Sequence, residues 1–323
     1  MTQPPDPDFL LERLAAGRPE RVRHVVDLPA ATARTAPWPA WLAGEVIDAF
    51  AARGILEPWE HQVAAAELAH RGSDVVLATG TASGKSLGYL MPTLSSIHAG
   101  IAAPDGRGAT ALYLSPTKAL AHDQMRALHE LDLPWLRAAP VDGDALPNER
   151  DWARAHANLV LTNPDFVHHA LLGNHRSWAS FLRRLRVVVI DECHGYRGVF
   201  GAHVGAIVRR LRRVAHHYGS DPVIVAASAT VADPANALAR LTGRSAEEIT
   251  DDASPRSRKV LAFWEPAELA VTDEHGDPVR RSATGETAEL LADLVAEGQR
   301  TLAFVRSRRG AEAVALAARA HLD

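Results

Sequence analysis

The chain has 323 residues, enough for two domains of ordinary size, and its 47% apolar and 23% charged residues argue against a largely disordered protein. The net charge of −4 excludes a broadly basic surface, so any surface for nucleic acid must be local. One cysteine, Cys193, excludes an internal disulfide, and neither a signal peptide nor ~18 consecutive apolar residues is present, so we expect a cytoplasmic protein without a membrane partner.

The first 55 residues are expected to form an N-terminal extension that is partly helical and packs on the core. Residues 1–39 are mixed in character and contain several prolines. Trp41, Val46 and Phe50 follow a helical spacing, and Gly54 is a suitable stop. A second helix is predicted over residues 60–70.

Five short apolar runs alternate with helical segments between residues 56 and 250. They are too short for helices and apolar on both faces, which is typical of buried parallel strands joined by crossover helices. The pattern predicts an α/β fold with a doubly wound parallel sheet, which binds ligands at the carboxyl ends of its strands. The runs are Val75–Ala78, Ala111–Leu114, Leu159–Thr162, Val187–Ile190 and Val223–Ala226.

The composition changes after residue 250, and residues 251–323 are predicted to hold a linker and the beginning of a second α/β domain. The polar stretch 251–259 contains Pro255 and is typical of a linker. In the remainder, the pattern predicts strands over 260–263 and 301–305, helices over 286–297 and 310–321, and a long loop over 266–285.

The first apolar run leads into a glycine-rich loop and then a helix. Gly84-Lys85-Ser86 has the form of the end of a Walker A loop, whose backbone N–H groups bind phosphate. In this interpretation Lys85 reaches the β- and γ-phosphates of ATP and Ser86 binds Mg²⁺. The alternative is a glycine-rich turn that contains Lys-Ser by chance, and Thr79 stands where the strict pattern has glycine. The predicted phosphate-loop residues are Thr79, Gly80, Thr81, Ala82, Ser83, Gly84, Lys85 and Ser86.

Two acidic residues follow the fourth apolar run, at the expected carboxyl end of its strand. Asp191 suits a magnesium ligand that acts partly through water, and Glu192 suits a general base for an attacking water. With Lys85 they form the predicted catalytic set. The alternative is a solvated acidic turn. Cys193 is interpreted as a packed small residue, and His194 as a residue that couples ATP to a second site.

The run Asp191-Glu192-Cys193-His194 resembles the DEAH-type box of superfamily-2 helicases, and other family motifs occur in the family's order. The resemblance implies two RecA-like domains, the first over residues 56–250, with ATP and Mg²⁺ as cofactors. It implies that Gln62 binds adenine with support from Trp59, that Ser228 and Thr230 couple hydrolysis to movement, and that a separate set contacts nucleic acid. That set comprises Pro116, Thr117, Lys118, Thr162, Asn163, Pro164, Arg306 and Arg308.

Three stretches are more similar to the MrfA/SftH group of DNA-repair helicases, namely residues 80–86, 196–204 and 306–312. This resemblance implies 3′-to-5′ movement on single-stranded or partly duplex DNA. Members of the group continue beyond this length with an arginine-bearing motif, so we expect the chain alone to bind Mg·ATP, hydrolyse it slowly and not unwind duplexes. The alternatives are a binding fragment whose missing half comes from another chain, and an RNA helicase.

Basic residues form two further clusters, and the first, Arg183, Arg184 and Arg186, precedes the fourth apolar run. Arg209, Arg210, Arg212 and Arg213 lie in the helical segment after the acidic pair, and either a solvated helix face or a DNA or partner surface fits them. Histidines such as His168 and His169 lack a metal-binding spacing and are interpreted as surface residues.

Overall fold

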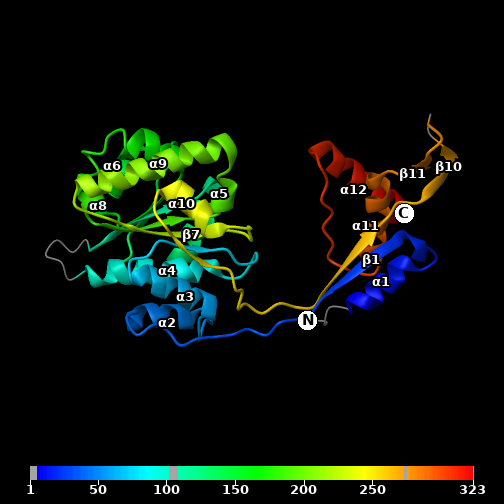
Figure 1. Ribbon diagram of the computed structural model, residues 1–323, viewed down its shortest axis with the longest axis horizontal. Helices are drawn as coiled ribbons and strands as arrows, with labels where there is room; N and C mark the ends of the chain where they lie inside the picture. Colours follow the sequence, from blue (N-terminus) through cyan, green and yellow to red (C-terminus); the bar gives the residue numbers. More distant parts are fainter. Residues whose placement is uncertain (1–5, 102–107, 273–274, 323) are drawn as a thin grey trace. The chain divides into compact units, whose positions relative to one another are not determined.

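A computed structural model of the chain describes residues 6–101, 108–272 and 275–322 (Figure 1). The chain forms two compact units, one from residues 32–255 and the other from residues 1–31 together with 256–323. This division differs from the predicted boundaries after residues 55 and 250. The difference arises because residues 32–55 pack in the larger unit, whereas the residues before them join the smaller one.

The larger unit is built on a seven-stranded parallel sheet with the order β4-β5-β3-β6-β7-β2-β8. The five predicted runs are confirmed as β2 (Val75–Leu77), β3 (Thr110–Leu114), β5 (Leu159–Thr162), β6 (Leu185–Ile190) and β7 (Val223–Ala227). The prediction missed β4 (Ala138–Pro140) and β8 (Glu247–Ile249), which are the edge strands. Both are three residues long and partly exposed, so neither has the apolar pattern of a buried strand.

Helices cover both faces of the sheet because alternate strand residues point to opposite sides (Figure 1). In β6, Val188 and Ile190 pack on one side, and Val187 and Val189 on the other. The first side is covered by α6 (Pro147–His156), α8 (Ala179–Arg183), α9 (Gly198–His217) and α10 (Pro234–Thr242). The second is covered by α2 (Gly44–Ala52), α3 (Glu60–His70), α4 (Lys85–Ala99) and α5 (Lys118–His129).

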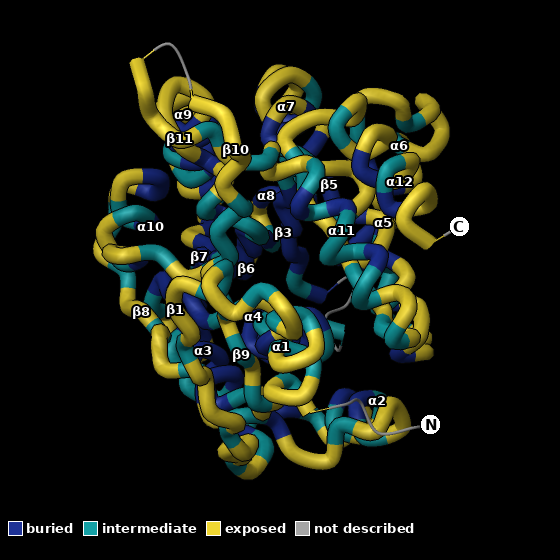
Figure 2. Tube along the Cα trace, turned by 90° about the vertical axis from the view of Figure 1, so that its right-hand side faces the viewer, coloured by how far each residue is buried: buried dark blue, intermediate teal, exposed yellow. Residues whose placement is uncertain are grey.

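Burial is greatest in the central strands, and all five residues of β3 are buried. Figure 2 shows the tube at β3 in dark blue, whereas the surface of α9 carries yellow, exposed positions. A fully buried leucine such as Leu112 contributes about 1.5–3 kcal/mol relative to an exposed one. The core therefore fixes the strand ends, and with them the loops that carry the predicted motifs.

The smaller unit pairs the N-terminal segment with the residues after the linker. Strand β1 (Val22–Leu28) pairs antiparallel with β9 (Lys259–Trp264), which confirms the predicted strand over 260–263. The other elements are α1 (Pro7–Ala15), β10 (Glu268–Thr272), β11 (Pro278–Arg280), α11 (Ala283–Ala296) and α12 (Arg308–Leu322).

The residues before 32 belong to this unit, where their strand β1 pairs with β9. Two predictions for this unit were wrong. The predicted loop over 266–285 contains the paired strands β10 and β11, although residues 273–274 lie outside the described residues. The predicted strand over 301–305 is irregular, and Leu302 and Phe304 are 83% and 90% exposed, since no described strand pairs with this stretch.

One buried carboxylate ties the N-terminal segment to the rest of the smaller unit. Glu286 of α11 is 3% exposed and accepts hydrogen bonds from Arg21 at 3.1 Å and from the Trp264 indole at 2.9 Å. Arg281 lies 3.2 Å from the same carboxylate. A buried charge is tolerated only with such partners, so this cluster specifies how the segment joins. Within the described ranges no helix is both long and apolar enough to cross a membrane.

Candidate nucleotide-binding site

The loop between β2 and α4 is shaped by two buried hydroxyl groups. The hydroxyls of Thr79 and Ser83 lie 2.6 Å apart, and Ser83 also donates to the Gly80 carbonyl at 2.8 Å. Ala82 and Gly84 both have left-handed backbones, with φ of 60° and 59°. A non-glycine residue in this region is uncommon and marks a constrained loop. The loop therefore curls tightly at the carboxyl end of β2.

Lys85 is the first residue of α4, and its ammonium lies inside the loop. It donates to the Gly80 carbonyl at 2.7 Å and to the Thr79 carbonyl at 3.4 Å. In the described part of the chain no carboxylate lies within ion-pair distance of it, and Thr81 and Ser86 are exposed beside it. A cation at a helix N-terminus, among backbone N–H groups, is suited to bind phosphate.

The side chain of Gln62 packs directly against this loop. Its Nε2 donates to the Gly84 carbonyl at 2.8 Å, and its Oε1 accepts from the Trp59 amide at 2.8 Å. A Cβ on Gly84 would lie 2.6 Å from Gln62 Nε2 and 2.9 Å from the Trp59 ring, so glycine is required there. Gln62, Trp59 and Ser86 line a cavity of about 360 Å³, a volume suited to a small ligand. Binding of adenine by Gln62 stays a prediction.

Asp191 follows β6 and is held by two tyrosine hydroxyls. Its Oδ2 accepts from Tyr113 of β3 at 2.5 Å and from Tyr89 of α4 at 3.4 Å, while its Oδ1 accepts from the Glu192 amide at 2.9 Å. Burial raises the pKa of both tyrosines well above the usual range, and the Asp191 charge adds to this, so both remain donors. Because Tyr89 lies in α4, the end of β6 and this helix share one cluster.

Sequence reasoning did not identify Tyr89 and Tyr113 as site residues. Tyr113 lies in an apolar strand and Tyr89 in the interior of a helix, so both matched the pattern of core residues. Their hydroxyls acquire a function only when β3, α4 and β6 meet, which no spacing within the sequence reveals.

His194 lies between the acidic pair and the loop after β7. Its Nδ1 is 3.1 Å from Glu192 Oε2 and 3.2 Å from the backbone nitrogen of Ala229. Nδ1 can accept from Ala229 only without a proton and can donate to Glu192 only with one, so the two contacts are alternatives. Ser228 is buried and bonds β2 through its backbone, whereas Thr230 is exposed. Glu192 itself has a left-handed backbone, with φ of 49°.

The described side chains fit a magnesium-bound triphosphate. Ser86 and Asp191 offer the hard oxygen ligands that Mg²⁺ prefers, and Lys85 offers a positive charge. Cys193 does not compete as a ligand, because burial raises the pKa of its thiol to about 11. Over the described ranges, no group of three His, Cys, Asp or Glu side chains forms a separate metal site.

The predicted nucleic-acid residues of the larger unit lie together, and two of them serve as helix caps. The Ser115 amide bonds the Thr162 carbonyl at 3.0 Å, which joins the ends of β3 and β5. Thr117 accepts from the Leu120 amide at 3.3 Å and Asn163 from the Phe166 amide at 2.9 Å, as N-caps do. Thr162 is 2% exposed and Pro164 is buried, so their side chains do not reach the surface.

Lys118 is the charged member of that set, and it is paired within the protein. Its ammonium bonds Asp144 and lies 3.4 Å from Asp142. The Lys118 pKa is raised, mainly by the hydrogen bond that its ammonium donates to Asp144. Contact with a phosphate would therefore exchange one anion for another. Pro116 is half-buried, and Arg306 and Arg308 are exposed in the smaller unit.

Three of the four arginines of α9 donate to backbone carbonyl groups, whereas Arg213 is exposed. Arg209 donates to the Arg240 carbonyl at 2.7 Å and Arg212 to the Thr242 carbonyl at 2.9 Å, both at the end of α10. Arg210 donates to the Leu172 carbonyl at 3.3 Å. These side chains cap the carbonyl groups of a neighbouring helix and turn, which is a structural role.

Two further residues contact the phosphate loop and were not among the predicted site residues. His61 bonds Ser83, and Asp252 bonds the amide of Gly80. His61 is adjacent to Gln62 in the sequence, but Asp252 lies far along the chain, in the stretch interpreted as a linker. Neither carries a sequence signal for the loop.

Comparisons with known proteins agree with this geometry. A family model described as DEAD/DEAH box helicase matches residues 59–238. The "Uncharacterized ATP-dependent helicase YprA" of Bacillus subtilis is 39% identical over 279 residues, which cover 85% of this chain and 36% of that protein. The "ATP-dependent helicase HRQ1" of Saccharomyces cerevisiae is 34% identical, covering 90% of this chain and 27% of that protein.

Comparison with solved structures also finds helicases. The crystal structure of "DUF1998 helicase MrfA bound to DNA and AMPPNP" has a TM-score of 0.88 and 35% identity, and the match covers 98% of this chain and 43% of that one. The same helicase bound to DNA alone gives a TM-score of 0.85 at 36% identity, covering 94% of this chain and 42% of that one. The larger unit thus has the RecA-like fold of helicases. The chain spans roughly a third of the length of these curated relatives.

Proposed function

Because the chain belongs to the DEAD/DEAH box helicase family, we propose that it is the ATP-binding and ATP-hydrolysing part of a motor that moves on DNA. The similarity to a helicase bound to DNA and AMPPNP supports both ligands. The relatives named as ATP-dependent helicases support the coupling of hydrolysis to strand separation, and a role in DNA repair follows from the MrfA/SftH resemblance.

Each residue of the site has a part in this proposal. Lys85 and the loop amides bind the β- and γ-phosphates, and Ser86 and Asp191 bind Mg²⁺. The magnesium ion neutralises charge on the phosphates when it is bound. Glu192 orients and deprotonates the attacking water. Gln62 contacts the adenine, with the Trp59 ring beside it in the cavity.

Coupling to nucleic acid is assigned to the loop after β7. His194 can bond either Glu192 or the amide of Ala229, so a change at Glu192 can reach this loop through one imidazole. Ser228 and Thr230 flank that amide. Nucleic acid is proposed to contact the surface around Thr117, Lys118 and Asn163, and Arg306 and Arg308 in the smaller unit. Lys118 would exchange its aspartate partners for a phosphate.

A single observation carries the proposal. The ammonium of Lys85 lies within a tight loop at a helix N-terminus, bonded to carbonyl groups and, within the described residues, without a carboxylate partner. Asp191 is tied by Tyr89 to the same helix, 3.4 Å away. A cation without a counter-anion, next to an oriented aspartate, supports binding of an anion together with a metal ion.

The decisive experiment measures binding of a fluorescent ATP analogue to the purified chain in the presence of Mg²⁺. Lys85→Ala should weaken binding by about 10- to 100-fold, the loss expected for a hydrogen bond between charged groups. Lys259→Ala removes an exposed lysine at the start of β9 and should leave binding unchanged. Equal affinity of the Lys85→Ala variant and the wild-type chain would refute the site.

The nucleic-acid partner is tested separately. Hydrolysis of ATP should rise on addition of single-stranded DNA, and competition between matched DNA and RNA strands distinguishes the polymers, because only RNA carries 2′-hydroxyls. A preference for RNA would replace the DNA assignment and leave the ATP site intact. A cytoplasmic location, and a separate chain that contributes to the motor, also belong to this proposal.

A further inference from the structure

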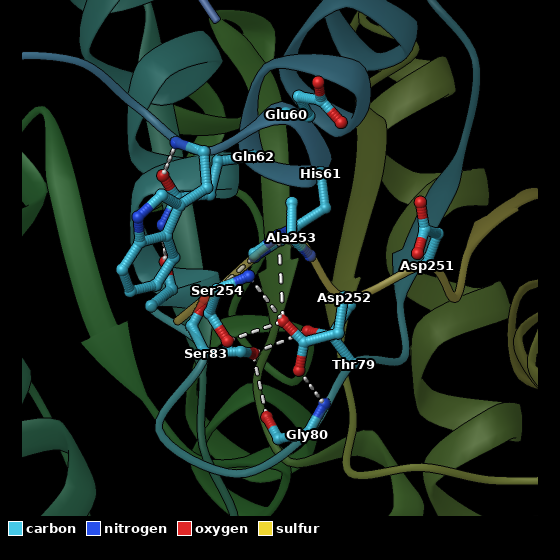
Figure 3. Close-up of polar contacts among 12 residues, drawn as sticks. Glu60, His61, Gln62, Thr79, Gly80, Ser83, Asp251, Asp252, Ala253 and Ser254 are labelled. Carbon is cyan, nitrogen blue, oxygen red and sulfur yellow. Dashed lines mark hydrogen bonds and ion pairs between the residues drawn. The ribbon is translucent and has the colours of Figure 1, made fainter. Parts of the chain in front are cut away.

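The segment after β8 returns to the phosphate loop before it leads into the smaller unit. Figure 3 shows Asp252 between Ser254 and Gly80. Its Oδ2 accepts from the Gly80 amide at 3.1 Å, and its Oδ1 accepts from the Ser254 amide at 2.9 Å and the Ser254 hydroxyl at 2.6 Å. One carboxylate therefore joins the phosphate loop to residues 251–254.

This contact and two others hold Gly80 through both of its backbone polar groups. While Asp252 holds its N–H, the Gly80 carbonyl accepts from the Lys85 ammonium at 2.7 Å and from the Ser83 hydroxyl at 2.8 Å. A Cβ on Gly80 would lie 2.9 Å from Asp252 Oδ2, so the close approach requires glycine. The position of the Lys85 ammonium is thus connected to Asp252 through a single residue.

His61 makes a second connection between the same segments (Figure 3). Its side chain is buried, with Nε2 at 2.8 Å from the Ser83 carbonyl and Nδ1 at 3.1 Å from the Ala253 amide. A carbonyl only accepts and an amide only donates, so the ring carries its proton on Nε2 and is neutral. Both ring nitrogens are satisfied, and one imidazole bridges the loop and the segment.

The segment is also held from its other side. The Arg34 amide donates to the Ala253 carbonyl at 3.0 Å, and the Arg34 guanidinium pairs with Asp251. Partial burial acts to raise the pKa of Asp252, but hydrogen bonds from Ser254 and Gly80 hold it below the usual value. The Asp252 side chain is therefore charged, and 26% of it is exposed. The charge favours the hydrogen bonds that Asp252 accepts from Gly80 and Ser254, and the partial exposure lets water compete for the carboxylate.

We propose that Asp252 and His61 are positioning residues that shape the phosphate loop and make residues 251–254 sensitive to bound nucleotide. The inference rests on the proposed ATP site. A phosphate that draws the Lys85 ammonium away from the Gly80 carbonyl removes one contact of the residue whose N–H group Asp252 holds. Because the segment continues directly to residue 256, where the smaller unit begins, it is a covalent path for this change.

Affinity is the first measurement. Asp252→Ala should weaken binding of a fluorescent ATP analogue by about 3- to 10-fold, the effect of a lost hydrogen bond in an ordered loop. Asp251→Ala is the matched control, since it removes the same charge one residue earlier, where the partner is Arg34 and not the loop. Equal affinity for the Asp252→Ala and Asp251→Ala variants would overturn the proposal.

A double-mutant cycle tests the geometry itself. Gly80→Ala should weaken binding in the wild-type chain, because the added Cβ meets Asp252, and should weaken it less in the Asp252→Ala background. Fully additive effects would show that the two residues do not act together. Thermal melting of each variant separates loss of folding from loss of the contact.

Hydrogen exchange provides a readout that does not depend on turnover. With saturating AMPPNP and Mg²⁺, exchange in a peptide that covers residues 251–255 should change in the wild-type chain. In the Asp252→Ala variant, at a nucleotide concentration that saturates it, the change should be lost. The Lys85→Ala variant should show a smaller change than the wild-type chain at the concentration that saturates the wild-type chain, because less of it is occupied.

The outcomes separate the two proposals. A wild-type chain that binds no nucleotide would overturn the proposed function. A wild-type chain that binds nucleotide without any change in exchange at residues 251–255 would overturn the positioning role and leave the ATP site intact. A change that persists in the Asp252→Ala variant would also overturn it, because the signal would then pass by another route.

Discussion

Strand β2 is tied at both of its ends to chain segments that follow β7, and the two ties differ in kind. At the amino end, Asp74 accepts from the Arg244 guanidinium at 2.8 Å and 3.0 Å and from the Ile224 amide at 2.8 Å. At the carboxyl end, Asp252 accepts from Gly80 and Ser254. Only 1% of the Asp74 side chain is exposed, compared with 26% of Asp252.

The difference in exposure distinguishes a contact that stabilises the fold from a contact in the proposed ligand site. A buried aspartate with a full set of partners cannot release them without a large cost, so Asp74 fixes β2, β7 and β8 together. A partly exposed aspartate, whose partners are the Gly80 amide and the amide and hydroxyl of Ser254, can exchange them for water. The amino ends of the strands therefore hold a contact that stabilises the fold, whereas the carboxyl ends carry the proposed ligand-binding and catalytic residues. We call these two sides of the sheet the amino edge and the carboxyl edge.

The largest expected effect lies at the carboxyl edge. Glu192→Gln should lower the rate of ATP hydrolysis by about 10²–10⁴-fold, because the amide cannot accept a proton from water. Nucleotide affinity and thermal stability should stay unchanged. Glu247→Gln, the same substitution at the exposed start of β8 on the amino edge, should alter neither rate nor affinity. Normal single-turnover hydrolysis by the Glu192→Gln variant would remove this residue from the role of base.

The next effect lies at the amino edge and concerns stability. Asp74→Ala should lower the free energy of unfolding by about 2–3 kcal/mol, since the Ile224 amide loses its acceptor and Arg244 is left without its buried partner. Urea denaturation measures this. Asp221→Ala removes the exposed partner of the same arginine, 2.8 Å away, and should cost at most about 1 kcal/mol.

The Asp74→Ala variant also tests whether the two edges are independent, because its loss of stability should not be accompanied by a loss of nucleotide affinity. The folded fraction of the Asp74→Ala variant should bind nucleotide with wild-type affinity, because Asp74 lies at the opposite end of β2 from the loop. A fall in affinity as large as that of a loop variant would mean that the two edges are not independent.

A smaller effect is expected from the tyrosine that holds Asp191. Tyr113→Phe removes the hydroxyl that lies 2.5 Å from Asp191 Oδ2. Mutation of a residue that hydrogen-bonds a metal ligand typically lowers metal affinity by about 10-fold or more. The Mg²⁺ concentration that half-saturates nucleotide binding should therefore rise about 10-fold. Tyr218→Phe loses a 2.8 Å bond to His175 near the amino edge and should leave the Mg²⁺ dependence unchanged. Identical Mg²⁺ curves for the two variants would count against the role of Tyr113.

The sequence predicted the central strands of the sheet but not the two outermost strands. The central strands were identified because Val187–Ile190 and its counterparts are continuously apolar and buried on both faces. The edge strands β4 and β8 lack that pattern. The stretch 301–305 has it, yet no described strand pairs with it, because pairing depends on partners that a local pattern does not specify.

Site residues were predicted where chemistry is local in the sequence. Lys85 and Ser86 follow the loop directly, and Asp191 and Glu192 are adjacent, so each pair has a recognisable spacing. Tyr113 and Asp252 have no such spacing. Asp252 contacts Gly80 only because β8 pairs with β2 and brings residues 251–254 back to the loop. Long-range pairing of this kind is fixed by the sheet and not by any short motif.

The smallest expected effect distinguishes the two edges by pH. Burial lowers the pKa of His61 from its ordinary value near 6.5, and the neutral ring accepts from the Ala253 amide. Below about pH 6.5, the His61 ring takes up a proton more readily when it is free of the Ala253 amide than when it accepts from that amide. The contact therefore loses stability as the pH falls through this range. The charged groups that face the ring are Asp252, Asp251 and Lys85.

Protection of the Ala253 amide from hydrogen exchange, corrected for the intrinsic rate, should therefore fall about 3-fold between pH 7.5 and 5.5. In the His61→Gln variant, which keeps one donor and one acceptor, the protection should not depend on pH in this range. The Ile224 amide, whose acceptor is Asp74, should keep constant protection in both proteins, because that tie contains no histidine. Equal losses of protection at the Ala253 and Ile224 amides would show that acid destabilises the whole sheet. The two edges would then not differ in their response to pH.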